Sequence, residues 1–185
     1  DAAQQTGKLS YDGYKKVWSD EFNGDSLNRA DWNVETHEKG WVNNELQEYV
    51  DSAENIQVKD GKLIINPVKK VTDGGTGSIK EATYYTSGRV STQNKQTFTY
   101  GRFECRAKVP KGQGYLPAFW LMANDENVYG QWPRCGEIDC MEVMGQETNK
   151  AYGTLHYGNP HSQSQGTYTI TDGADFSDDF HIYTC

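Results

Sequence analysis

Apolar and polar residues alternate in short runs along this chain, and glycine, asparagine, aspartate and proline separate the runs. A period of two is typical of a β-strand that buries one face. The clearest run is 100–109, which places Phe103, Cys105, Ala107 and Val109 on one face and charged residues on the other. Short alternating strands divided by turn residues predict an all-β sandwich or barrel with very little helix.

Turn and loop residues locate the connections between these strands. Residues 56–66 predict a β-hairpin, because Asp60 and Gly61 readily supply the positive φ angles of a tight turn. Two stretches rich in glycine, serine and asparagine, 71–78 and 159–166, are predicted to be surface loops.

Three carboxylates lie close together in the apolar, strand-like run 136–144. On an extended strand Glu137 and Asp139 share a face, whereas regular alternation would point Glu142 into the core. An unpaired buried charge is costly, and one extra residue near Cys140 corrects the parity, because a β-bulge turns Glu142 to the face of the other two acids. The pattern therefore predicts both a bulge and a row of carboxylates.

A row of close carboxylates suits the cleavage of glycosidic bonds. One ionised carboxylate attacks the anomeric carbon, and one protonated carboxyl donates a proton to the leaving oxygen. Because close like charges do not all ionise at neutral pH, Asp139 should help to keep one flanking glutamate protonated and hydrogen-bond the other. The same spacing also fits an acidic strand edge or a set of calcium ligands, and taken alone it leaves these alternatives open.

The motifs around the three acids help to choose among these alternatives. They are 114–122, 131–145 and 153–157, with further matches at 17–24, 41–49, 87–90 and 101–109. Together they resemble glycoside hydrolase family 16, and within it the laminarinase-like endo-1,3-β-glucanases, over nearly the whole chain. The residue inserted before Glu142 matches the bulged Glu-x-Asp-x-x-Glu branch of that family.

This resemblance implies a jelly-roll β-sandwich of two antiparallel sheets with a concave substrate cleft. It implies retaining endo-hydrolysis of β-1,3-glucan (laminarin) or mixed-linkage β-1,3/1,4-glucan, with Glu137 as nucleophile, Glu142 as general acid/base and Asp139 as assisting acid. Retention needs the two working carboxyls about 5 Å apart, which a shared face allows. The implied substrate-binding residues are Trp120, Trp132, His156, Asn44, Glu45 and Arg89. A hydrolase or transglycosylase of the same family acting on another polysaccharide remains an alternative.

The resemblance implies no cofactor for the chemistry. It places Glu21 and the backbone carbonyl of Gly61 among the ligands of a structural calcium ion, which prefers oxygen. The remaining histidines, His37, His161 and His181, are scattered along the sequence, which argues against a zinc site.

The composition of the chain limits the classes of molecule that it is expected to bind. The net charge of −8 and the dispersed basic residues argue against nucleic acid, and no stretch has the apolar length to span a bilayer. The 12 Tyr and 5 Trp suit a neutral polysaccharide, since the C–H faces of sugar rings pack on aromatic surfaces. No basic cluster surrounds the acids, which argues against a sulfated polymer. The polymeric substrate leads us to expect a secreted protein, although no signal segment is present.

Four cysteines are too few for a dense disulfide framework in a chain of 185 residues. We interpret them mainly as buried or half-buried thiols, with Cys140 beneath the acid-bearing strand. Cys105 has the core parity of its own strand, and the sequence does not decide any pairing.

The chain ends at Cys185, within what the resemblance implies is one strand of a longer domain. We therefore expect a single, incomplete catalytic domain over 1–185: a fragment, a domain that receives a segment in trans, or one completed by exchange between copies. Two other classes stay open, a non-catalytic glucan-binding sandwich and a calcium-binding structural sandwich. The intact Glu137 and Glu142 argue against a pure binder, which has no need of paired acids that cost stability.

Overall fold

Short β-strands make up most of the regular structure in the computed structural model, which describes residues 11–72 and 82–185. Contacts within the chain divide it into two compact units, Asp1–Gln96 and Thr97–Cys185. Each unit is described by itself, and a single domain over 1–185 stays a prediction. Within the described ranges, no helix combines the length and apolar character needed to cross a bilayer.

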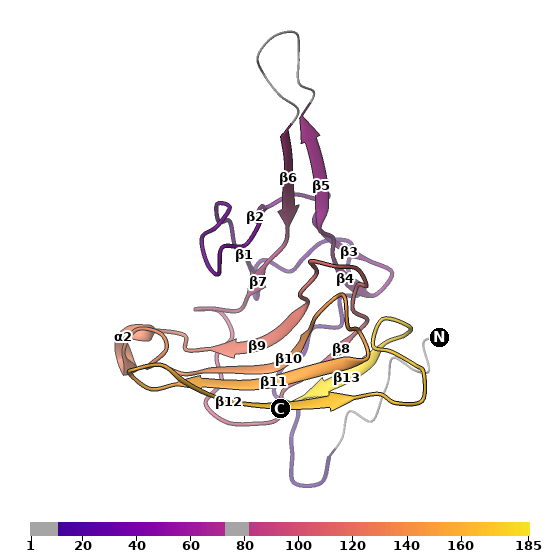
Figure 1. Ribbon diagram of the computed structural model, residues 1–185. Coiled ribbons are helices and arrows are strands. Elements are labelled where there is room, and N and C mark those ends of the chain that lie inside the picture. The colour runs from indigo at the N-terminus through magenta and orange to yellow at the C-terminus, as the bar shows by residue number, and fades with distance from the viewer. Residues whose placement is uncertain (1–10, 73–81) are drawn as a thin grey trace. The chain divides into compact units, whose positions relative to one another are not determined.

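The first unit contains a three-stranded sheet in the order β2–β6–β5 (Figure 1). Its strands are β2 (Gln47–Tyr49), β5 (Val68–Thr72) and β6 (Ala82–Ser87). The pair β2–β6 is parallel, whereas β5–β6 is antiparallel. The predicted loop at 71–78 begins with the last two residues of β5, and the rest of it lies outside the described residues.

Two antiparallel pairs complete the described part of the first unit. They are β1 (Asn33–Val34) with β7 (Val90–Ser91), and β3 (Ile56–Lys59) with β4 (Lys62–Ile65). The β3–β4 hairpin confirms the turn predicted from the sequence, because Asp60 and Gly61 have φ angles of 53° and 69°.

The second unit is built on a four-stranded antiparallel sheet in the order β12–β11–β10–β9 (Figure 1). Its strands are β9 (Ala118–Met122), β10 (Glu137–Val143), β11 (Lys150–Tyr157) and β12 (Ser162–Thr169). The predicted loop at 159–166 is therefore wrong from Ser162 onward. All residues of β12 are exposed, so this edge strand has no alternation of apolar and polar residues to reveal it.

A second layer covers one face of this sheet. It is the antiparallel pair β8 (Glu104–Ala107) and β13 (His181–Thr184). The predicted strand at 100–109 is thus shorter than expected, but its parity is correct. The two layers share one buried cluster, which consists of Val109, Met141, Val143, Phe176 and Tyr183. This core fixes which face of β10 is buried and leaves the other face for polar side chains.

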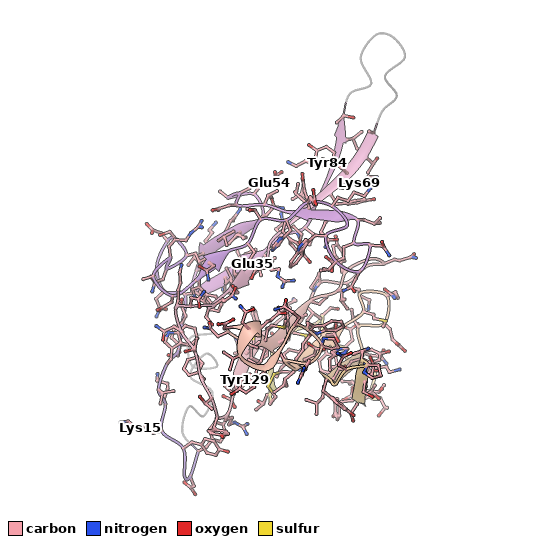
Figure 2. The ribbon with its side chains drawn as sticks, turned by 90° about the vertical axis from the view of Figure 1, so that its left-hand side faces the viewer. Lys15, Glu35, Glu54, Lys69, Tyr84 and Tyr129 are labelled. Carbon is pink, nitrogen blue, oxygen red and sulfur yellow. A yellow bond between two sulfur atoms is a disulfide. The ribbon has the colours of Figure 1, made fainter. Side chains whose placement is uncertain are left out.

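A single turn of helix, α2 (Glu126–Tyr129), precedes β10. The side chain of Asp125 caps it by accepting a hydrogen bond from the backbone N–H of Asn127. Tyr129 at its end is 70% exposed, and Figure 2 labels this side chain.

Candidate active site

Strand β10 contains a one-residue β-bulge between Asp139 and Glu142. Asp139 pairs with Thr154 of β11, and Glu142 pairs with Tyr152, so β10 has one residue more than its partner over this interval. The register against β9 shifts at the same place, between Asp139 and Met141. The predicted bulge is confirmed.

The bulge separates the acids from the core. Met141 and Val143 belong to the buried cluster and are 3% and 0% exposed. Cys140 lies on the same inner side and forms a disulfide with Cys185. Glu142 is only half-buried and lies outside that cluster, so the extra residue has turned it away from the apolar side chains.

Asp139 lies at the centre of the polar face. It is 4% exposed, and its Oδ2 lies 3.1 Å from Nε2 of His156. Burial, the hydrogen bond with Glu137 and the negative charges of Glu137 and Glu142 raise the pKa of Asp139 to about 8. Asp139 is therefore mostly protonated at neutral pH and donates its hydrogen bond to Glu137.

Glu142 has the properties of a proton donor. Burial raises its pKa, the negative charge of Glu137 raises it further, and His156 opposes the shift. A raised pKa keeps a carboxyl protonated closer to neutral pH, as a general acid requires. The two glutamates thus occupy different environments on one strand, as the sequence led us to expect.

Two tryptophans flank the acids. Nε1 of Trp132 donates to Oε2 of Glu137 over 2.6 Å, and the Trp132 side chain remains 44% exposed. The backbone N–H of Trp132 donates to Glu126 on α2, which fixes the loop that carries the ring. Trp120 lies directly opposite Asp139 on β9, so its side chain emerges on the same face of the sheet.

The first unit holds the other predicted sugar-binding residues. Nε of Arg89 lies 2.6 Å from Oε2 of Glu35, which is labelled in Figure 2, and the Arg89 guanidinium is 5.0 Å from the ring centre of Trp41. Glu45 accepts hydrogen bonds from the side chains of Gln47 and Tyr49. Their role in sugar binding stays a prediction.

Asn44 and the predicted calcium ligands also belong to the first unit. Asn44 has a positive φ of 54° in the loop before β2. Glu21 is exposed, and Gly61 lies in the β3–β4 turn. In the described part of the chain, the one group of three His, Cys, Asp or Glu side chains close enough to share a metal ion is Glu137, Asp139 and His156. Glu21 is not part of it, so calcium also stays a prediction.

His161 is a contact that sequence reasoning missed. Its Nε2 lies 2.9 Å from Nδ1 of His156, and the two rings stack with centres 5.2 Å apart. The ring centre of His161 is also 5.1 Å from that of Trp132. The β11–β12 hairpin brings His161 back beside His156, and only a correct prediction of that hairpin would have revealed the pair.

The prediction that the cysteines are thiols is correct for only two of the four. Cys105 and Cys135 are free thiols, and burial raises the pKa of Cys105 to about 11. The interpretation of Cys140 and Cys185 as thiols is wrong, because these two residues form a disulfide. They are 45 residues apart in sequence, and only the packing of β13 against β10 brings them together.

Comparison with known proteins decides the family. The model described as "Beta-porphyranase A-D, GH16 domain" matches residues 14–185. The chain belongs to glycoside hydrolase family 16. This GH16 chain is 40% identical over 185 residues to glucan endo-1,3-beta-glucosidase A1 of Niallia circulans, covering 93% of the chain and 26% of that protein. It is 44% identical over 170 residues to glucan endo-1,3-beta-glucosidase of Cryptopygus antarcticus, covering 90% of the chain and 60% of that protein.

A solved structure supports the same assignment. The endo-beta-1,3-glucanase of Pyrococcus furiosus matches with a TM-score of 0.79 and 35% identity, over 91% of this chain and 65% of that one. The predicted all-β jelly-roll class of this GH16 chain is thereby confirmed. The chain spans less than two thirds of the length of each of these three proteins.

Proposed function

We propose that this GH16 chain is the part of a retaining endo-β-1,3-glucanase that carries its catalytic acids. Its substrate is β-1,3-glucan of the laminarin type or mixed β-1,3/1,4-glucan. The observation that carries the proposal is the bulge in β10, which turns Glu142 out of the core beside Glu137 and Asp139. A double displacement needs one carboxyl to attack and another to donate a proton, and the raised pKa of Glu142 suits the donor.

The reaction assigns one role to each acid. Glu142 donates its proton to the glycosidic oxygen while Glu137 bonds to the anomeric carbon and the C–O bond breaks. The ionised Glu142 then takes a proton from water, the water oxygen attacks the anomeric carbon, and Glu137 leaves as a carboxylate. Asp139 donates a hydrogen bond to Glu137, which stabilises the carboxylate when it leaves. No step requires a cofactor.

Charge favours a neutral substrate over a sulfated one. The matching family model is named for porphyranases, whereas the two relatives described above, which are two among several, are named for 1,3-β-glucan. A sulfated polymer calls for basic side chains near its sulfate groups. The cross-strand neighbours of the three acids contain no lysine or arginine; they are Met122, Trp120, Ala118, His156, Thr154 and Tyr152. The sequence from Thr97 to Cys185 has eleven acidic and six basic residues, which disfavours an anionic polymer further.

Aromatic and polar side chains supply the proposed sugar contacts. The exposed ring of Trp132, together with Trp120, offers apolar surface to sugar rings. His156, Asn44, Glu45 and Arg89 are proposed to hydrogen-bond sugar hydroxyls, which need directed donors and acceptors. Their loss should raise KM for the glucan.

Reducing-sugar release tests the function. The chain and its Glu137→Ser variant are incubated with laminarin, with mixed-linkage glucan and with a sulfated galactan. We expect release from the neutral glucans by the unmodified chain alone. Binding of laminarin without cleavage by either protein would instead identify a glucan-binding sandwich, and cleavage of the sulfated galactan alone would overturn the substrate class.

We further propose that the protein acts outside the cell. The Cys140–Cys185 disulfide supports this, because such bonds persist in oxidising compartments, and a glucan polymer outside the cell must be cleaved before it can be taken up. Detection of the native protein in the culture medium of the organism that produces it tests the proposal. Detection of the protein only inside the cells would contradict it.

A structural calcium ion is a separate proposal. Glu21 would supply a carboxylate and Gly61 a backbone carbonyl, both hard oxygen donors, among the six to eight oxygen ligands that calcium takes. We expect calcium to raise the melting temperature of the unmodified chain and to leave that of Glu21→Ala unchanged. Equal shifts in both proteins would contradict this site.

A further inference from the structure

The two histidines beside the acids form a chain of contacts that ends at Glu137. His156 stands in the middle, with Nε2 3.1 Å from Oδ2 of Asp139 and Nδ1 2.9 Å from Nε2 of His161. Trp132 turns this chain into a closed circle of five residues, because its ring lies against His161 and its indole N–H donates to Glu137. The last link is the hydrogen bond between Glu137 and Asp139. Each member of this circle therefore touches two others.

The protons in this circle have a consistent arrangement. A neutral imidazole carries one proton, and the hydrogen bond at one nitrogen decides the state of the other. The proton of Asp139 lies in its hydrogen bond to Glu137, so the carboxyl can accept at Oδ2 from Nε2–H of His156. Nδ1 of His156 is then unprotonated and accepts from Nε2–H of His161. Every contact has one donor and one acceptor.

We propose that His161 is a positioning residue for the glycosidase reaction, which rests on the proposed function. By donating to Nδ1 of His156 it holds that imidazole in the Nε2–H tautomer. His156 then donates to Asp139, and Asp139 keeps its own proton directed at Glu137. Without His161, water at Nδ1 accepts or donates equally well, and the Nδ1–H tautomer, which leaves Asp139 without a donor, becomes populated.

The groups around His156 and His161 favour donation from Nε2–H of His156 to Asp139. The groups that face it are Glu137, Asp139 and Glu142 from β10, Trp132 from the loop before that strand, Thr154 from β11, and Gln163 from β12, which pairs with His156. None of them is a cation, and Oγ1 of Thr154 already accepts from Gln165. Oδ2 of Asp139, 3.1 Å from Nε2 of His156, is an acceptor because the proton of Asp139 lies toward Glu137, so the Nε2–H side of His156 faces it.

Two substitutions separate the hydrogen bond of His161 from its shape. His161→Phe keeps an aromatic ring to stack on His156 and Trp132 but has no donor. His161→Gln loses the ring but keeps an amide N–H that can reach Nδ1. His181→Gln is a control in the same unit, because His181 lies on β13 against Phe176 and belongs to no part of the circle.

The tautomer is read by NMR of the full chain labelled with ¹⁵N-histidine, at a pH where both imidazoles are neutral. We expect Nε2–H at His156 in the unmodified chain, in His161→Gln and in His181→Gln, and a mixture of tautomers in His161→Phe. With laminarin we expect kcat to fall about tenfold in His161→Phe with KM within about twofold, and to recover largely in His161→Gln.

Other results overturn the inference. One is Nδ1–H at His156 in the unmodified chain, a measurement that needs no variant and no activity. Another is an unchanged tautomer and kcat in a folded His161→Phe. If the unmodified chain cleaves no glucan, the proposed function fails, but the NMR measurement still decides what His161 does to His156.

Discussion

The indole N–H of Trp132 donates to Oε2 of Glu137 over 2.6 Å. A donated hydrogen bond stabilises negative charge on a carboxylate, and the proposed nucleophile must be ionised to attack. The same tryptophan remains 44% exposed, so its ring is available to a sugar while its nitrogen holds Glu137 in place. One residue thus couples substrate contact to the orientation of the nucleophile.

Replacement of Trp132 by phenylalanine tests this coupling. The ring surface is largely kept, but the hydrogen bond to a charged group is lost, which is worth about 1.5–3 kcal/mol. We expect kcat/KM for laminarin to fall on the order of 10- to 100-fold, mainly through kcat. Trp18→Phe is the control, since the Trp18 indole donates to Asp31 in the first unit. An equal loss in both variants would show that the effect is general damage to the fold.

The stability of the chain should depend on pH through Asp139. Its pKa is about 8 in the folded chain against 3.8 for an ordinary aspartate, so between these values the folded chain holds a proton that the unfolded chain has lost. The unfolding free energy therefore falls as pH rises from about 4 to about 8. Glu142, whose pKa is also raised, contributes a fall of the same sign.

Asp139→Asn removes the larger of these two shifts. Urea denaturation at several pH values from 5 to 8 should show a shallower fall in unfolding free energy for the variant than for the unmodified chain. Asp175, whose pKa is lowered chiefly by its hydrogen bond with Lys111, acts below this range and does not interfere. Parallel slopes in the two proteins would contradict the protonation of Asp139 at neutral pH.

Azide distinguishes the roles of the two glutamates. Glu142→Ala lacks the general acid/base, so hydrolysis of laminarin should fall by about 10²–10⁴-fold. With an aryl β-glycoside that has a good leaving group, Glu137 still forms the glycosyl-enzyme, and azide then attacks it to give the β-glycosyl azide. The matched variant Glu137→Ala should give the α-glycosyl azide. Exchange of these two products would reverse the assignment.

The Cys140–Cys185 disulfide should stabilise the second unit. It joins the bulged part of β10 to the residue after β13 and closes a long loop. Its removal in Cys140→Ala/Cys185→Ala should lower the unfolding free energy by about 2–4 kcal/mol. A reducing agent should destabilise the unmodified chain and leave the double variant unchanged. A count of four free thiols in the unreduced, unfolded chain, instead of two, would contradict the pairing.

The sequence revealed those features that depend on local parity and charge. The bulge at Cys140–Met141 follows from one conflict, because regular alternation would bury the charge of Glu142. The Asp60-Gly61 turn follows in the same way from local backbone preference. In both places the residues that determine the structure are neighbours along the chain.

Other features depend on contacts between distant segments and gave no such signal. Strand β12 is polar on both faces, so nothing in its sequence distinguishes it from a loop. The partner of Cys140 depends on how β13 packs against β10, and the role of His161 depends on the β11–β12 register. Histidines that appear scattered in sequence are therefore adjacent in the fold.

The stereochemistry of the first product tests the central claim most directly. Hydrolysis of a laminari-oligosaccharide by the chain is followed by ¹H NMR in the first minutes, before the free anomers equilibrate. Glu137 and Glu142 acting together across one linkage by double displacement predict that the β-anomer appears first. Initial release of the α-anomer would contradict the account, because inversion requires the two carboxyls to lie far enough apart to admit a water molecule between them and the sugar.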